Sequence, residues 1–181
     1  MKIMSRVFMA MTALLVLTIT NGNSITIASD INPSDPVQKS PRQEATGEID
    51  GVSITVDYGS PYVKGRTIWG GLEKYGEVWR AGANKATSVE FSKDVKINGK
   101  ELAAGKYALF IIPNEKDDWV VIFNEGWDAS GTQYSEDKDV LRISVKPKWS
   151  DEVVESLTYS VDKTLNFAWE KAAINLTVES E

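Results

Sequence analysis

The sequence predicts an all-β protein, an antiparallel β-sandwich or jelly-roll-like domain with one long, ordered loop rich in glycine and tryptophan. Beyond Pro41, β-branched and aromatic residues alternate with polar ones along most of the chain. Turn dipeptides separate the alternating segments, which is typical of hairpins. No segment of ten or more residues carries a helical stripe. A chain with about nine short strands and frequent turns favours a sandwich over alternating strands and helices.

The turn dipeptides and the alternation between them locate the predicted strands. Asp50-Gly51 predicts a hairpin that pairs residues 43–49 with the alternating segment 52–58. Asn98-Gly99 is the strongest short hairpin signal and ends the strand that contains Val95 and Ile97. The same alternation predicts further strands over 107–113, 119–124, 140–146, 153–162 and 173–179.

The N-terminal part predicts export. Residues 1–28 have the outline of a secretory signal peptide, because Lys2 and Arg6 precede an apolar run that small and polar residues follow. The small-residue pattern fits cleavage after Ala28 and equally after Gly22. The apolar run is shorter than the ~20 residues of a membrane-spanning helix, so we expect no span once the signal is removed.

The expected domain organisation has three parts. After the signal peptide, residues 29–41 hold three of the six prolines and predict an extended linker. Residues 42–181 then form a single β-sandwich domain, whose length suits one hydrophobic core. We expect a periplasmic or extracellular location.

Composition excludes several kinds of chemistry. The formal net charge of −6 argues against a nucleic-acid partner, which needs a basic surface. The absence of cysteine and histidine excludes disulfides, thiolate nucleophiles, zinc–thiolate sites and Ser–His–Asp triads. Lysines interrupt the acidic turns at 115–118 and 135–139, which therefore do not fit a calcium loop. We expect no cofactor and no metal.

Residues 59–86 break the alternation and predict the functional loop. The segment combines six glycines with four tyrosines and tryptophans, and it carries basic residues in an otherwise acidic protein. Long loops inside compact domains are often functional. An arginine fork could bind an anion or a planar carboxylate. The candidate ligand-binding residues are Lys64, Arg66, Trp79, Arg80 and Asn84.

A structural alternative stays open for the same residues. Arg66 and Arg80 could hold the loop by pairing with Asp57, Glu73 or Glu77, while Trp69 and Trp79 fill the end of the core. The two roles are compatible.

Several motifs resemble the bacterial domain-of-unknown-function family 2911. They are Asp57-Tyr58-x-x-Pro61-x-x-Lys64-Gly65-Arg66-x-Ile68-Trp69-Gly70, Val78-Trp79-Arg80-x-Gly82-Ala83-Asn84-x-Ala86-Thr87, Ala104-Gly105-x-Tyr107-x-Leu109-Phe110-x-Ile112-Pro113, Trp119-x-Val121-Ile122-Phe123-Asn124 and Asp139-Val140-Leu141-Arg142. The resemblance runs from about Ser40 to the end of the chain. It implies an exported bacterial domain and supplies no activity.

The residues favour a binding module for a small anionic molecule, a glycan or an envelope protein over an enzyme. The first alternative is a histidine-independent, glycosidase-like hydrolase, which needs two carboxylates across a cleft. Acidic residues near the loops could supply them, namely Asp57, Glu73, Glu77 and Asp128, but no catalytic residue is assigned. The second is a structural envelope component. Trp127 and Trp149, beside loop residues, are candidates for stacking on sugar rings, whereas Trp119 and Trp169 are expected in the core.

Overall fold

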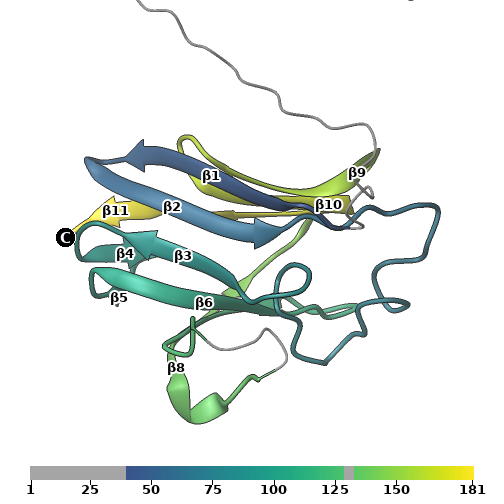
Figure 1. The fold of residues 1–181 in the computed structure, drawn as a ribbon, viewed down its shortest axis with the longest axis horizontal. Coiled ribbons are helices and arrows are strands. Elements are labelled where there is room, and N and C mark those ends of the chain that lie inside the picture. Colours follow the sequence, from purple (N-terminus) through teal and green to yellow (C-terminus); the bar gives the residue numbers. More distant parts are fainter. Residues whose placement is uncertain (1–39, 129–132) are drawn as a thin grey trace, which may run out of the picture. The chain divides into compact units, whose positions relative to one another are not determined.

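The structure is a computed structural model that describes residues 40–128 and 133–181, and nearly all of its regular elements are β-strands (Figure 1). The strands, in chain order, are β1 (Arg42–Ile49), β2 (Val52–Gly59), β3 (Thr87–Phe91), β4 (Val95–Ile97), β5 (Lys100–Leu102), β6 (Gly105–Ile112), β7 (Trp119–Asn124), β8 (Asp139–Val145), β9 (Lys148–Val161), β10 (Leu165–Leu176) and β11 (Val178–Ser180). A 3₁₀ turn, η1 (Glu136–Lys138), precedes β8.

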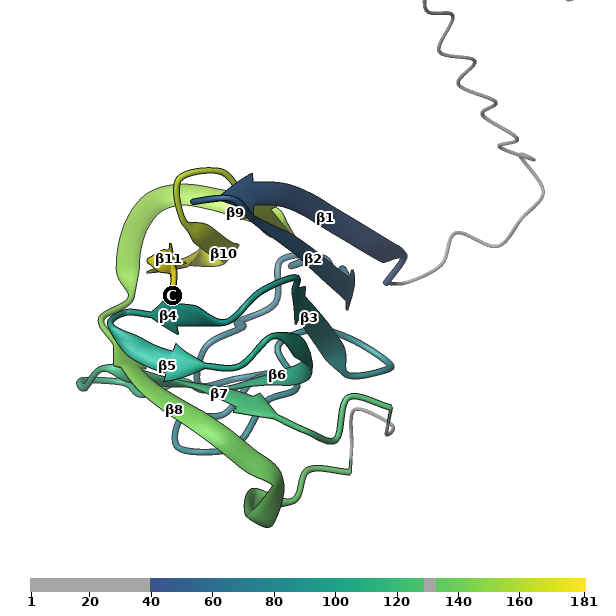
Figure 2. The same ribbon diagram turned by 90° about the vertical axis from the view of Figure 1, so that its left-hand side faces the viewer.

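The strands form antiparallel sheets, which confirms the predicted all-β sandwich class. One sheet has six strands in the order β1-β2-β3-β6-β7-β8. The β9–β10 hairpin and the small sheet β11-β4-β5 make up the rest. In Figure 2 the long strand β9 curves from the side of β8 toward β1, so the hairpin covers the face of the large sheet. Tyr159 of β9 and Phe167 of β10 there share an apolar hollow with Leu109, Ile111 and Val121 of the large sheet.

Both hairpins that the turn dipeptides predicted are present. Asp50 and Gly51 have φ angles of 50° and 71°, and β1 and β2 pair in register from Ile49↔Val52 outward. Asn98 and Gly99 have φ angles of 47° and 78° between β4 and β5. Positive φ at both central residues produces the turn whose twist matches that of the flanking strands.

Four strands differ from the expectation. β3 was not predicted, and β9 and β10 begin earlier than predicted, at Lys148 and Leu165. The segment 173–179, predicted as one strand, is divided between the end of β10 and β11, which pairs with β4 in another sheet. The pairing of β9 with β10 shifts register on either side of Glu170, whose φ is 54°. The bulge changes which positions are buried, from Leu165, Phe167 and Trp169 before it to Ala172, Ile174 and Leu176 after it, so the two halves of β10 do not form one continuous alternating pattern.

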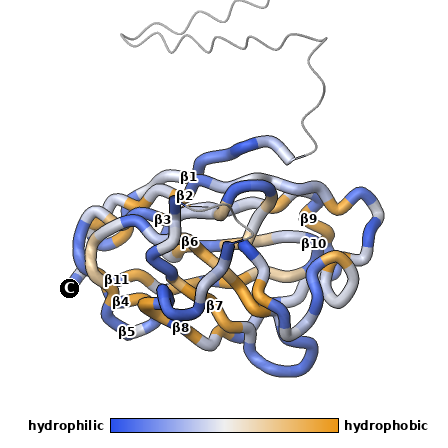
Figure 3. The backbone as a smooth tube through the Cα atoms, turned by 60° about the horizontal axis from the view of Figure 1, so that its bottom comes forward, coloured by the Kyte–Doolittle hydropathy of each residue, from blue (hydrophilic) through white to orange (hydrophobic). Residues whose placement is uncertain are grey.

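The large sheet is apolar on both faces at β6 and β7. Leu109, Ile111 and Phe123 point into the main core, while Phe110 and Ile122 belong to a second buried cluster on the opposite face. This explains why residues 107–111 are buried without alternation. Figure 3 shows hydrophobic stretches along the interior strands and hydrophilic residues on the projecting turns.

The predicted signal peptide and most of the linker, residues 29–39, lie outside the described residues. No helix in the described part of the chain is long and apolar enough to cross a membrane.

The two ends of the 59–86 loop meet backbone to backbone. The Ala83 N–H donates to the Gly59 carbonyl at 3.1 Å. A Cβ atom on Gly59 would lie 2.2 Å from the Ala83 carbonyl oxygen, and one on Gly82 would lie 2.5 Å from the Thr87 Oγ1 atom. These glycines therefore allow a close approach that a larger residue would prevent.

We expect Gly59→Ala to destabilise the domain, because the added methyl group must push the Ala83 backbone away. Overpacking of this kind costs about 1–3 kcal/mol, which lowers the melting temperature by roughly 3–10 °C for a domain of this size. Thermal unfolding of the purified domain measures the change. Ser53→Ala, an exposed position on the same strand, is the control, and equal melting of the two variants would contradict the contact.

Candidate functional site

The 59–86 loop is attached to both layers of the sandwich. On its entering side the Val63 N–H donates to the Glu155 carbonyl of β9 at 2.7 Å, and the Ser60 hydroxyl donates to the Leu157 carbonyl at 2.7 Å. On its returning side Trp79 and Ile111 of β6 exchange two backbone hydrogen bonds of 2.8 Å. The loop therefore closes the end of the sandwich at which it emerges (Figure 1).

A cluster of tryptophans fills that end. The rings of Trp69, Trp79 and Trp169 have centroids 5.6–5.7 Å apart, and Trp119 packs on Trp69 at 4.5 Å. All four are buried. The structure thus confirms the core position expected of Trp119 and Trp169 and the exposure expected of Trp127 and Trp149. Trp69 and Trp79 lie in the core as the structural alternative required, so the ring of Trp79 is not on the surface as its candidate ligand-binding role implied.

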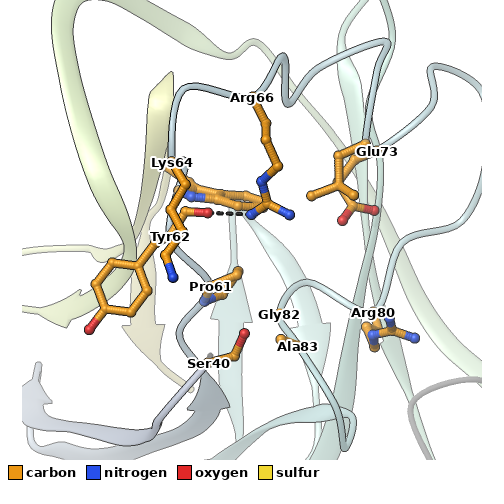
Figure 4. Close-up of a pocket in the computed structure, with 11 residues that line it drawn as sticks. Ser40, Pro61, Tyr62, Lys64, Arg66, Glu73, Arg80, Gly82 and Ala83 are labelled. Carbon is orange, nitrogen blue, oxygen red and sulfur yellow. Dashed lines mark hydrogen bonds between the residues drawn. The ribbon is translucent and has the colours of Figure 1, made fainter. Parts of the chain in front are cut away.

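A hollow of about 440 Å³ lies on the loop beside this cluster. Its wall combines charged residues with apolar ones: Lys64, Arg66, Glu73, Arg80, Tyr62, Leu72 and the edge of the buried Trp169. Figure 4 shows Arg66 and Glu73 reaching into the pocket from the same side, with Arg80 below Glu73 and Ser40 and Gly82 toward the opposite end. The size is typical of a small-molecule site.

Arg80 is held in the wall by a strained turn. Ala81, which follows it, is fully buried and has a φ of 52°. Its carbonyl accepts hydrogen bonds from the Thr87 hydroxyl at 2.9 Å and from the Tyr159 hydroxyl at 2.8 Å. These two bonds hold a backbone conformation that costs about 1–3 kcal/mol by itself.

The Arg80 side chain has no partner in the described part of the chain. Its Nε atom is buried without a hydrogen-bond acceptor. None of the ion pairs among the described residues involves Arg80 or Arg66. The pairing with Asp57, Glu73 or Glu77 that the structural alternative required is therefore absent there, and Asp57 pairs with Arg42 instead.

Arg66 is held by backbone carbonyl groups, and Lys64 lies beside an aromatic ring. The Arg66 guanidinium donates to the Val63 carbonyl at 3.0 Å and to the Tyr62 carbonyl, which orients it without neutralising its charge (Figure 4). The Lys64 ammonium lies 5.5 Å from the centre of the Tyr62 ring. Both residues are exposed to solvent and present positive charge at the mouth of the hollow.

Of the described residues, Glu73 alone contributes an acidic side chain to the wall of this hollow. Burial raises its pKa to about 7, and the nearby charges of Arg80 and Arg66 lower it in part. Burial outweighs the attraction because neither guanidinium is within ion-pair distance of the carboxyl group. Near neutral pH the group therefore exchanges between charged and neutral forms.

The structure brings three of the five candidate residues together. Lys64, Arg66 and Arg80 line the hollow, whereas Trp79 lies behind it in the core and Asn84 lines a neighbouring hollow. Sequence reasoning did not place Glu73 or Tyr62 in the site, although both belong to the same loop. No sequence pattern could have assigned Trp169 to the site, because it lies far along the chain from the loop.

We expect Arg80→Met to leave the melting temperature unchanged or to raise it, since the replacement removes a buried donor that has no acceptor. Tyr159→Phe is the matched comparison. It removes one of the two hydrogen bonds to the Ala81 carbonyl and should cost about 1 kcal/mol. A fall of on the order of 10 °C for Arg80→Met, as expected on losing a buried ion-pair partner, would show that the arginine holds the fold.

The Glu73 carboxyl group should make stability depend on pH. Its pKa is higher in the folded protein, about 7, than the ordinary value of 4.5, so the folded state binds the proton more tightly. Its contribution is therefore favourable at low pH and is lost as the pH rises toward and through 7. Glu73→Gln should raise the melting temperature more at about pH 8 than at about pH 5. The exposed Glu77→Gln is the control, and an equal effect at both pH values would contradict the shift.

Comparison with known proteins identifies one family. The model of the family described as "Protein of unknown function (DUF2911)" matches residues 40–178, which includes the loop, the tryptophan cluster and the hollow. No curated protein and no solved structure matches the chain. The match extends over well more than half of the chain, and the protein therefore belongs to the DUF2911 family.

Proposed function

We propose that the domain is a binding module that takes a small anionic ligand in the hollow of the 59–86 loop. The observation that carries the proposal is the Arg80 Nε atom, a buried charged donor that finds no acceptor among the described residues, in the wall of a ligand-sized hollow. Buried charged groups are normally paired. An anionic ligand would supply the missing acceptor.

The other groups of the wall suit the same ligand. Arg66 is oriented by backbone carbonyls, so its remaining N–H groups need no side-chain movement to meet an incoming carboxylate. Glu73 would repel an anion in its charged form, but its neutral form can donate a hydrogen bond. Since its pKa is raised to about 7, binding should tighten below that pH.

The proposal includes export to the periplasm or the cell exterior. It rests on the basic residues and apolar run of residues 1–28 and on the proline-rich segment 29–41. An exported module that binds small anions would meet its ligand outside the cytoplasm.

The arrangement gives less support to a hydrolase that works through paired carboxylates. A glycosidase needs two carboxyl groups flanking one bond, and Glu73 has no acidic neighbour in the wall of the hollow. Asp57, a candidate for the second group, is engaged by Arg42. The described residues contain no group of three or more acidic side chains arranged to hold a metal ion.

Thermal-shift titration tests the binding proposal. The mature domain is titrated at about pH 6 with galacturonate, succinate, phosphate and sulfate, and with neutral galactose for comparison. At least one anion should raise the melting temperature and saturate, because a ligand at 100 times its Kd stabilises the folded state by about 2.7 kcal/mol. The neutral sugar should have no effect.

Variants link that shift to the hollow. Arg80→Gln should weaken binding about 10- to 100-fold, since a charge-assisted hydrogen bond contributes roughly 1.5–3 kcal/mol. Arg80→Lys should weaken it less. Lys163→Gln, an exposed lysine outside the hollow, should bind as the unchanged protein does. If no anion shifts the melting temperature, or if Arg80→Gln binds normally, the proposal is wrong.

A further inference from the structure

The hollow beside Arg80 continues into two more along the same surface. The second hollow is lined by Ser40, Arg42, Asp57, Asn84 and Lys85 and measures about 400 Å³. It shares Ser40 with the first hollow. The third, also about 400 Å³, shares Arg42, Asp57 and Lys85 with the second.

One stretch of backbone forms the common border. Gly82 and Ala83 line the first hollow, Asn84 and Lys85 the second, and Lys85, Ala86 and Ser88 the third. Six residue steps span at most about 20 Å when extended. This border is bent, so the groove that the three hollows form is shorter than that limit, but each of the adjoining hollows measures 400–440 Å³, and together they offer more room than one small anion needs.

The groove is basic although the protein is acidic. Arg42 is neutralised by its ion pair with Asp57. Five further cations line the groove, and none of them forms an ion pair with a described acidic residue: Lys64, Arg66, Arg80, Lys85 and Lys106. Two carboxyl groups oppose them, Glu73 and Asp128, in a chain whose net charge is −6.

An aromatic ring lies beside a lysine at each end of the groove. The Lys64 ammonium is 5.5 Å from the centre of the Tyr62 ring at one end, and the Lys106 ammonium is 5.0 Å from the centre of the Trp127 ring at the other. Trp127 is 45% exposed, although a large aromatic ring gains by burial. The C–H face of a pyranose ring stacks on such a ring, and a carboxylate on the sugar can reach the adjacent ammonium group.

We infer that the groove binds a linear glycan that carries carboxylate groups, with one acidic sugar in the Arg80 hollow and further sugars reaching Trp127. This inference rests on the proposed function, since the Arg80 hollow is one of its subsites. An acidic peptide would satisfy the cations but has no apolar ring face for the two aromatic side chains. A uronate oligosaccharide satisfies both sets of groups.

Isothermal titration of the mature domain with galacturonate oligomers of one to five units at low salt tests the inference. Affinity should rise about tenfold or more from the monomer to the tetramer, because additional sugars reach Lys85, Lys106 and Trp127. It should fall as salt is added, since exposed charges are screened. Cellotetraose, which is neutral, should not bind measurably.

Variants separate the inference from the proposed function. Lys106→Gln and Trp127→Ala should remove the gain with length and leave monomer binding unchanged, whereas Arg80→Gln should weaken both. Trp149→Ala, the other strongly exposed tryptophan, and Lys163→Gln are the matched controls. If the monomer binds but affinity does not rise with the length of the oligomer, the extended groove is not a glycan site, and the proposed function still stands. If no galacturonate oligomer binds, the inference about the groove is wrong, and the titration with succinate, phosphate and sulfate decides whether the proposed function holds. If tetraglutamate binds as tightly as the galacturonate tetramer, the groove binds an acidic peptide and the inference of a glycan is wrong.

Discussion

The closure of one end of the sandwich is the constraint on which the candidate site depends. Two layers of strands leave an apolar gap at each end, and a domain without disulfides must fill it by packing. Here the 59–86 loop crosses the gap and is hydrogen-bonded to β9 on one side and to β6 on the other. Trp69 and Trp79 pack from the loop onto Trp169 of β10, so one aromatic cluster joins the loop to the opposite layer.

This packing decides where the charged groups lie. Trp79 is fixed by its backbone bridge to Ile111, with its ring in the core. Successive side chains of an extended segment point to opposite sides, so Arg80 must face away from that core. The turn at Ala81 then holds it there through the hydrogen bonds from Thr87 and Tyr159. The partly buried Arg80, which no described acidic residue neutralises, is thus a consequence of how Trp79 beside it is buried.

The positive charges in the wall of the hollow are not neutralised by ion pairs with the described acidic residues. Burial raises the pKa of Glu73, which weakens its ability to neutralise Arg80 and Arg66 near neutral pH. A structural ion-pair network would bring the charges into contact and lower that pKa. The separation of charges instead leaves the guanidinium groups available to a third group, which is the physical basis of the proposed anion site.

Much of the fold could be predicted because local signals and tertiary structure agree. Asp50-Gly51 and Asn98-Gly99 encode their own hairpins through positive φ angles, and alternation located most of the remaining strands. The exceptions have physical causes. β3 is short and four of its five residues are buried, so it shows little alternation. The bulge around Glu170 separates the alternation of the first half of β10 from that of the second, and exposed charged residues such as Asp151 obscured the start of β9.

By itself, the sequence determined the class of fold, the position of the 59–86 loop and the basic residues that this loop carries, because composition and turn chemistry are local properties. Only the tertiary structure decided which of those residues meet. It placed Trp79 in the core and Arg80 in the wall, although the two are adjacent in sequence. It also brought the buried Trp169 to the wall of the Arg80 hollow and Lys106 to the neighbouring hollow, since strand pairing joins segments that no local pattern connects.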